Sequence, residues 1–206
     1  MVNDCKGWSV SQPNSKKQNL IKGDGLTYDD YASIDNGYRY ELARGQLELM
    51  SPAPLVIHQL VSFEMHKRIN RSCESEYIIL YAPVDIILSP AEEVRQPNLI
   101  LVHRDRMNII KRRGIEGPPD LIVEILSPST LKQDKIDKLK TYAHYNIPEY
   151  WIVDPISGIL EQYTIDKDRY EMTNIFQGTD SVCSPNISCV SFTMEEIMDS
   201  IPNIQD

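Results

Sequence analysis

One acidic residue stands inside the most apolar run of the chain. Glu124 interrupts the sequence LIVEIL, residues 121–126, in which every other member is aliphatic. Such a run is typical of a strand buried on both faces, where a carboxylate is costly unless a cation, a metal ion or several hydrogen bonds stabilise it. Glu124 is therefore the leading candidate for a functional side chain. A structural ion pair with a neighbouring Arg or Lys is the alternative.

Basic residues gather on both sides of Glu124, although the net charge of the chain is −9. Residues 154–206 contain ten acidic and two basic residues, so this segment carries −8 of the total. The rest is nearly neutral and holds two basic groups, at 95–113 and 132–140. They could form a local surface that binds phosphate, with Arg112 and Arg113 as candidate contacts. A solvated loop and a charged helix face explain the same charges equally well.

The segments around Glu124 predict a parallel βαβ unit. The sequence SPST at 127–130 offers capping residues for a helix that runs to about residue 146. The sequence EYWIVDP, which begins at residue 149, predicts the next strand. A strand, helix and strand in this order favour a right-handed connection between parallel strands.

The N-terminal half predicts a tail, a hairpin and then a helix. Residues 1–25 are rich in Asn, Ser, Lys and Gly, which predicts a poorly ordered tail before a single domain over residues 26–206. Thr27 can cap a short helix. Residues 38–50 form two alternating stretches around Gly45, a pattern typical of a β-hairpin. A helix is expected over 51–71.

Short strands follow this helix, and the chain ends in another helix. Three β-branched runs predict strands at 77–81, 84–88 and 98–102. Residues 158–165 and the stretch around Tyr170 predict two antiparallel strands. The last helix is expected from Thr193, which can cap it.

Several of these segments resemble the Uma-two family of restriction-endonuclease-like proteins, a branch of the PD-(D/E)XK nuclease superfamily. The matching strings are YELARG, LELMSPAP, APVDIILS, RQPNLILV, PPDLIVEILSPST and IPEYWIVDP, with Asp134, Lys138 and Tyr142 between the last two. The resemblance covers about residues 26–163. It implies an α/β fold with a restriction-endonuclease-like mixed sheet flanked by helices and an N-terminal β-hairpin. It also implies a nuclease that acts on DNA.

The resemblance further implies a metal site for Mg²⁺ or Mn²⁺. Glu124 takes the position of the strand acid, Asn98 that of the second acid, and Glu41 that of an upstream acid, with Glu48 as its alternative. Hard divalent cations prefer oxygen ligands, and they activate bound water. Asn98 departs from the family pattern because an amide brings no negative charge. Either the remaining ligands and a substrate phosphate compensate, or catalysis is weakened or lost.

Lys138 and His58 complete the set of residues that the resemblance implies. Leu126 stands where the motif lysine is expected, two residues after Glu124, and Lys138 matches the family's helix lysine instead. Asp134 and Lys138 also have the spacing of an ordinary helix pair worth ~0.3 kcal/mol. His58 matches a family histidine that could donate to a phosphate or hold a metal-bound carboxylate. A structural histidine fits its position equally well.

Asp120 is not expected to share a metal with Glu124. Four residues along a strand span about 13 Å, whereas both ligands of one Mg²⁺ lie within about 2.1 Å of it. We expect Asp120 to shape the turn before the strand.

These residues predict a metal-dependent endonuclease that hydrolyses DNA by attack of water. The first alternative is a catalytically degenerate nucleic-acid-binding or regulatory module on the same fold. The second alternative is a protein-interaction unit that uses the acidic C-terminal part. A homodimer would give one active site to each strand of the DNA.

The remaining expectations concern location and cysteine chemistry. The apolar runs are too short to cross a bilayer and the N-terminus has no apolar signal segment, so we expect a cytoplasmic protein without a membrane partner. Cys5, Cys73, Cys183 and Cys189 are scattered, without metal-ligand spacing. All four are expected to be reduced thiols.

Overall fold

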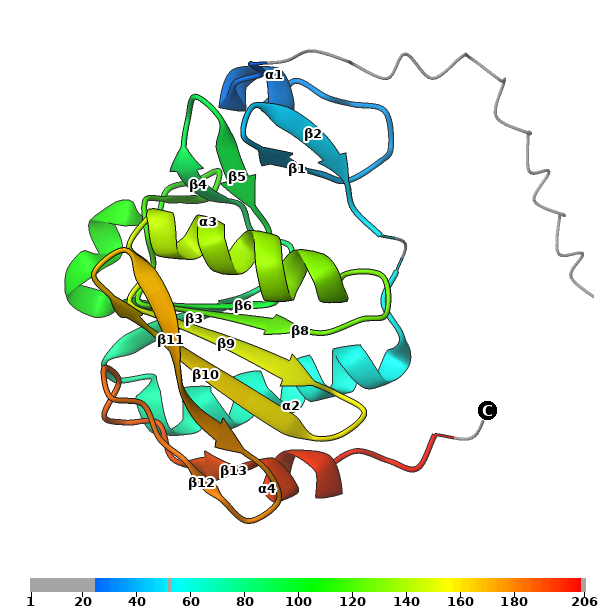
Figure 1. The fold of residues 1–206 in the computed structure, drawn as a ribbon, viewed down its shortest axis with the longest axis vertical. Helices are drawn as coiled ribbons and strands as arrows, with labels where there is room; N and C mark the ends of the chain where they lie inside the picture. The colour runs from blue at the N-terminus through cyan, green and yellow to red at the C-terminus, as the bar shows by residue number, and fades with distance from the viewer. Residues whose placement is uncertain (1–24, 52, 205–206) are drawn as a thin grey trace, which may run out of the picture.

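A mixed six-stranded sheet forms the centre of the computed structural model, which describes residues 25–51 and 53–204 (Figure 1). Its strand order is β11-β10-β9-β8-β6-β3. The bounds are β3 (Tyr77–Tyr81), β6 (Leu99–His103), β8 (Leu121–Ile125), β9 (Glu149–Asp154), β10 (Ile159–Asp166) and β11 (Arg169–Phe176). The β8 and β9 strands are parallel and the other neighbours antiparallel, which confirms the predicted βαβ unit and the two antiparallel strands after it.

Residue alternation along β8 decides which way Glu124 points. Leu121, Val123 and Ile125 belong to the core that includes helix α2 (Val56–Cys73). Ile122 belongs to the opposite core, which includes residues of helix α3 (Leu139–His144). Since strand side chains alternate between faces, Glu124 shares the α3 face of the sheet with Ile122.

A second sheet carries the predicted hairpin, with strand order β2-β1-β5-β4-β7. Its strands are β1 (Tyr40–Ala43), β2 (Gln46–Leu49), β4 (Ile86–Ser89), β5 (Glu93–Arg95) and β7 (Ile115–Glu116). Arg44 and Gly45 have φ values of 52° and 72°, as a tight two-residue hairpin turn requires. The β5 strand was not predicted, because its short sequence EVR reads as a charged turn rather than a buried strand.

Two of the three predicted helix caps are confirmed, whereas the residues at 127–130 do not cap the π-helical segment Gln133–Lys138, whose N-cap Lys132 has no side-chain cap bond. Helix α1 (Tyr28–Ala32) begins after Thr27 and helix α4 (Met194–Asp199) after Thr193, and both threonines form capping boxes. The remaining elements are the 3₁₀ helix η1 (Arg104–Ile109) and strands β12 (Ser181–Val182) and β13 (Phe192–Thr193).

The helix predicted after β8 is not a uniform α-helix. A π-helical segment, η2 (Gln133–Lys138), precedes α3. Such wide turns are rare and often mark functional positions. Asp134 and Lys138 are both buried in this segment.

The expectation of four reduced cysteines was wrong for one pair. Cys73, at the end of α2, forms a disulfide with Cys189, which lies between β12 and β13. The two residues are far apart in sequence and become neighbours only through the packing of the C-terminal segment on α2, so scattered spacing could not reveal them. Cys183 is free and exposed, whereas Cys5 lies outside the described residues.

Two further expectations concern the ends of the chain and membranes. The predicted tail lies outside the described residues except for Gly25, and the boundary at residues 25/26 stays a prediction. Within residues 25–51 and 53–204, no helix is both long and apolar enough to span a membrane.

Candidate active site

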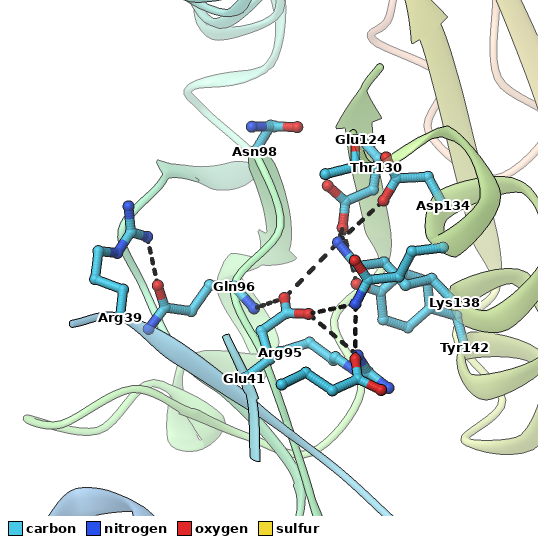
Figure 2. Close-up of polar contacts among 12 residues, drawn as sticks. Arg39, Glu41, Arg95, Gln96, Asn98, Glu124, Thr130, Asp134, Lys138 and Tyr142 are labelled. Carbon is cyan, nitrogen blue, oxygen red and sulfur yellow. Dashed lines mark hydrogen bonds and ion pairs between the residues drawn. The ribbon is translucent and has the colours of Figure 1, made fainter. Parts of the chain in front are cut away.

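Glu124 and Lys138 form a buried ion pair on the α3 face of the central sheet (Figure 2). The Lys138 Nζ atom lies 2.7 Å from Glu124 Oε1, and the Tyr142 hydroxyl donates to the same oxygen at 3.0 Å. Lys138 ends η2 and Tyr142 lies in α3, one α-helical turn apart on the face that covers β8. The structure thus brings together Glu124 and Lys138, which the sequence analysis had placed on a strand and on a helix.

Two further carboxylates surround the same ammonium group. Asp134 Oδ1 lies 3.1 Å from Lys138 Nζ, and Glu41 Oε1, from the hairpin, lies 3.7 Å from it. Burial lowers the pKa of Lys138, but the charges of Glu124, Glu41 and Asp134 outweigh burial and raise it well above its usual value. Lys138 therefore stays protonated throughout the physiological pH range.

Arg95 holds the outer part of this cluster and is 2% exposed. Its Nε donates to Glu93 at 2.6 Å, and its Nη1 lies 3.1 Å from Glu41 and 3.2 Å from Glu48. Gln133 Nε2 donates to Glu48 at 2.7 Å. Arg95 therefore does not belong to a basic surface, as its place in the sequence had suggested. It is a buried partner for the carboxylates of the second sheet.

Both candidates for the upstream acid reach this cluster, but in different ways. Burial raises the pKa of Glu41, but the charges of Lys138 and Arg95 lower it by more. The net shift is downward, so Glu41 is ionised. Glu48 contacts Arg95 rather than Lys138 and its side chain is 39% exposed. Glu41 is thus the one of the two that lies beside Lys138.

Asn98 lies beside the ion-pair cluster rather than within it (Figure 2). The register that pairs Leu99 with Val123 continues to Asn98 opposite Glu124. However, Asn98 Oδ1 accepts a 2.7 Å hydrogen bond from the backbone N–H of Ile125. The amide oxygen is therefore used to join β6 to β8 beyond the last ladder pair.

His58 lies next to Asn98 on the first turn of α2. Burial lowers its pKa, although hydrogen bonding to the Ile125 backbone and the Asn98 side chain favours the charged form. Its Nδ1 atom is buried without a hydrogen-bond partner. A neutral, partly unsatisfied imidazole thus lies close to the candidate ligands.

Glu124 is a carboxylate whose pKa is strongly raised. Burial raises it, Lys138 lowers it, and repulsion by Asp134 and Glu41 raises it again, to about 8. The upward direction follows first from burial, and the charge balance adds to it, since five carboxylates share Lys138 and Arg95. Such an excess of buried negative charge favours protonation of one acid.

The donor set fits a hard divalent cation in its chemistry. Glu41, Glu124 and Asp134 offer carboxylate oxygens, and Asp134 Oδ1 is buried without a hydrogen bond. Over the described residues, no three His, Cys, Asp or Glu side chains are arranged to hold a metal ion. The Lys138 ammonium lies between these donors, so in this arrangement it neutralises the charge that a metal ion would neutralise.

The remaining basic candidates lie elsewhere. Arg113 lines a surface hollow with Tyr28 and Asp85, and Arg112 lines a neighbouring one with Asp85. Asp120 accepts hydrogen bonds from the His103 backbone and from Arg106, both at 2.7 Å, so it fixes the turn before β8 as expected.

Sequence reasoning did not assign Asp134, Tyr142 or Arg95 to the site. The first two had a usable signal, because they lie four residues before and after Lys138 and share its helix face. Arg95 had no such signal, since its short strand was not expected.

The raised pKa of Glu124 predicts that stability falls as pH rises. The folded protein keeps a proton that the unfolded chain releases between pH 4.5 and about 8, so the free energy of unfolding decreases through this window. In Glu124→Gln this contribution is absent. We expect wild type to lose about 2–4 kcal/mol relative to Glu124→Gln between pH 4.5 and 8.5, measured by urea denaturation. Parallel pH profiles for the two proteins would contradict the shift.

Comparisons with known proteins agree with the fold described above. The family model Uma2, described as "Putative restriction endonuclease", matches residues 27–195. A similar crystal structure is that of a "putative nuclease belonging to DUF820" from Anabaena variabilis ATCC 29413, with a TM-score of 0.69 and 15% identity over 84% of this chain and 98% of that one. At that identity the likeness shows the fold alone. No curated protein matches. Because the family model covers most of the sequence, this chain belongs to the Uma2 family of restriction-endonuclease-like proteins.

Proposed function

We propose that this protein is an endonuclease that hydrolyses phosphodiester bonds of DNA at the Glu124–Lys138 site with Mg²⁺ or Mn²⁺. The observation that carries the proposal is the convergence of Glu124, Lys138 and Glu41, from three separate elements, within one buried cluster. A buried charge cluster of this kind is a weak way to stabilise a fold, because desolvation offsets most of the attraction. Its position within a nuclease-like fold supports a catalytic use.

Glu124 and Glu41 would hold the cation, with Asp134 beside them and Asn98 as a neutral ligand. When bound, a divalent cation lowers the pKa of a coordinated water and neutralises charge on the phosphate. Glu124 must be ionised to act as a ligand, so cation binding competes with the proton that Glu124 holds below about pH 8. Activity is therefore expected to rise with pH up to that value.

Lys138 acts as a fixed positive charge rather than as a base. Its raised pKa keeps the ammonium protonated, so it cannot accept a proton from water near neutral pH. It can stabilise the extra negative charge that develops on the phosphate oxygens in the transition state. For this, the ammonium must exchange part of its contact with the carboxylates for contact with the substrate.

A catalytically degenerate nucleic-acid-binding module is the second candidate. The observation that favours it is the hydrogen bond from Ile125 N–H to Asn98 Oδ1, which gives the amide a structural use. Lys138 is also fully surrounded by protein carboxylates. Both features describe a site that is stable without a metal ion.

Glu124→Gln tests the proposal directly. It should reduce Mg²⁺- or Mn²⁺-dependent plasmid nicking to background, because the central ligand loses its charge. The matched control is Glu161→Gln, since Glu161 pairs with Lys135 at the same 2.7 Å distance outside the site. Nicking by Glu124→Gln at the wild-type rate would exclude catalysis at this site.

Lys138→Ala should lower the nicking rate by about 10²- to 10³-fold, because its partner is the transition-state phosphate. Cation affinity, measured by calorimetry, should change little or increase, because an ammonium group leaves the ligand cluster. Lys135→Ala, on the same helical segment, should retain nearly full activity. An equal loss of activity in both variants would show that Lys138 has no special role.

Asn98→Asp separates a weakened nuclease from a degenerate one. An Asp oxygen can keep the bond from Ile125 N–H while adding a charge beside Glu124, so Mg²⁺ binding should tighten by about 10- to 100-fold. Nicking should increase in parallel. The control is Asn108→Asp, an exposed residue on η1. If neither wild type nor Asn98→Asp binds Mg²⁺ in calorimetry, the binding-module function replaces the nuclease.

A further inference from the structure

Four tyrosines line an open hollow of about 510 Å³ beside the candidate active site. Tyr28 and Tyr31 come from α1, and Tyr38 and Tyr40 from the start of the hairpin. The rings of Tyr28 and Tyr31 lie 6.1 Å apart with an angle of 31° between them. The volume falls within the range of small-molecule sites, and aromatic walls of this kind bind flat rings by stacking.

The floor of the hollow carries a fixed polar network. The Tyr31 hydroxyl donates to Asp85 Oδ1 at 2.9 Å, and Gln96 Nε2 donates to the same oxygen at 2.7 Å and to the Tyr31 hydroxyl at 2.9 Å. Gln96 Oε1 in turn accepts from Arg39. Gln96 is thus committed to internal contacts, and Asp85 is the acidic acceptor that the hollow presents to an occupant.

Two arginines stand among the residues that line the hollow. Arg39 and Arg113 both line it and both are exposed. Arg113 belongs to a basic turn with Lys111 and Arg112, and this turn also lines the neighbouring hollow. A flat ring that carries a phosphate would therefore find aromatic walls, an acidic acceptor below and cationic side chains at the rim.

One residue joins this hollow to the candidate active site. The Gln96 side chain lies in the floor of the hollow, and its backbone N–H donates to Glu41 Oε1 at 2.9 Å (Figure 2). Tyr40, in the wall, directly precedes Glu41 in β1. The two sites therefore lie on opposite sides of the same two backbone segments.

We infer that this hollow, defined by Tyr28, Tyr31, Tyr38, Tyr40 and Asp85, binds one unpaired nucleobase of the DNA strand that the neighbouring site acts on. The inference rests on the proposed function and specifies its substrate as DNA with an unstacked base. Asp85 selects bases that carry an exocyclic amino group, such as cytosine, over thymine, because a carboxylate accepts hydrogen bonds from such groups.

Binding without metal tests this inference separately from catalysis. The probes are fluorescein-labelled single-stranded oligo(dC), oligo(dT) and an abasic oligonucleotide of equal length, measured by anisotropy at low salt. Wild type should bind oligo(dC) most tightly. Tyr38→Ala should weaken oligo(dC) binding by about 10-fold and abasic binding much less. Asp85→Asn should reduce the preference for oligo(dC) over oligo(dT).

Tyr81→Ala is the matched control, because Tyr81 is also exposed but makes an edge-to-face contact with His66 outside the hollow. It should bind all three probes like wild type. Thermal melting of each variant checks the fold. A photo-crosslink from 5-iodocytosine-labelled oligonucleotide to wild type requires no variant and should map to residues 28–40.

The outcomes distinguish this inference from the nuclease. Equal weakening of oligo(dC) and abasic binding by Tyr38→Ala, or equal effects of Tyr38→Ala and Tyr81→Ala, would overturn the base site. Plasmid nicking that depends on Glu124, without base-dependent binding, would also overturn it while leaving the nuclease intact. Base-dependent binding through the hollow without nicking would support the base site and reject catalysis.

Discussion

The placement of one ammonium group among three carboxylates determines how the site is built. Lys138 lies within 3.7 Å of Glu124, Asp134 and Glu41, which come from the central sheet, a π-helical segment and the hairpin. Burial favours the neutral form of a carboxylate, and the charge of Lys138 opposes this effect by lowering the pKa of both Glu41 and Glu124. The ion pairs of Lys138 therefore join three parts of the fold. Arg95 adds to this by pairing with Glu41 and Glu93.

The same cluster creates a conflict between stability and function. Five acidic groups share two cations, so one proton or one metal ion improves the charge balance. Binding a divalent cation and a substrate phosphate would require Lys138 to release some of its present contacts. Under the proposed function, the neutral Asn98 would contribute less to cation binding than an acid and would leave Lys138 in its present contacts more often.

Much of this arrangement could be predicted from particular residues. A lone acid in an apolar run indicated that Glu124 is buried and has a charged partner, and the strand, helix and strand order indicated the parallel pair. Motif resemblance then identified Lys138 and Glu41. Other contacts depend on tertiary structure alone, which sequence spacing does not encode. The burial of Arg95, the bond from Ile125 to Asn98 and the disulfide between Cys73 and Cys189 all join residues that have no local relation.

The disulfide encloses most residues of the candidate site in one covalent loop and leaves Glu41 outside it. The covalent loop from Cys73 to Cys189 contains Arg95, Asn98, Glu124 and Lys138, whereas Glu41 lies outside it on the hairpin. The hairpin joins the loop through the ladder pair of Leu42 with Val94, through the apolar cluster that these two residues form with Ile87, and through hydrogen bonds and ion pairs such as those of Glu41 and Glu48. The position of Glu41 therefore depends on packing and polar contacts, whereas the disulfide also closes the other residues into one covalent loop. Under the proposed function, local opening of the hairpin would expose Lys138 to the substrate while the covalent loop keeps its closed connection.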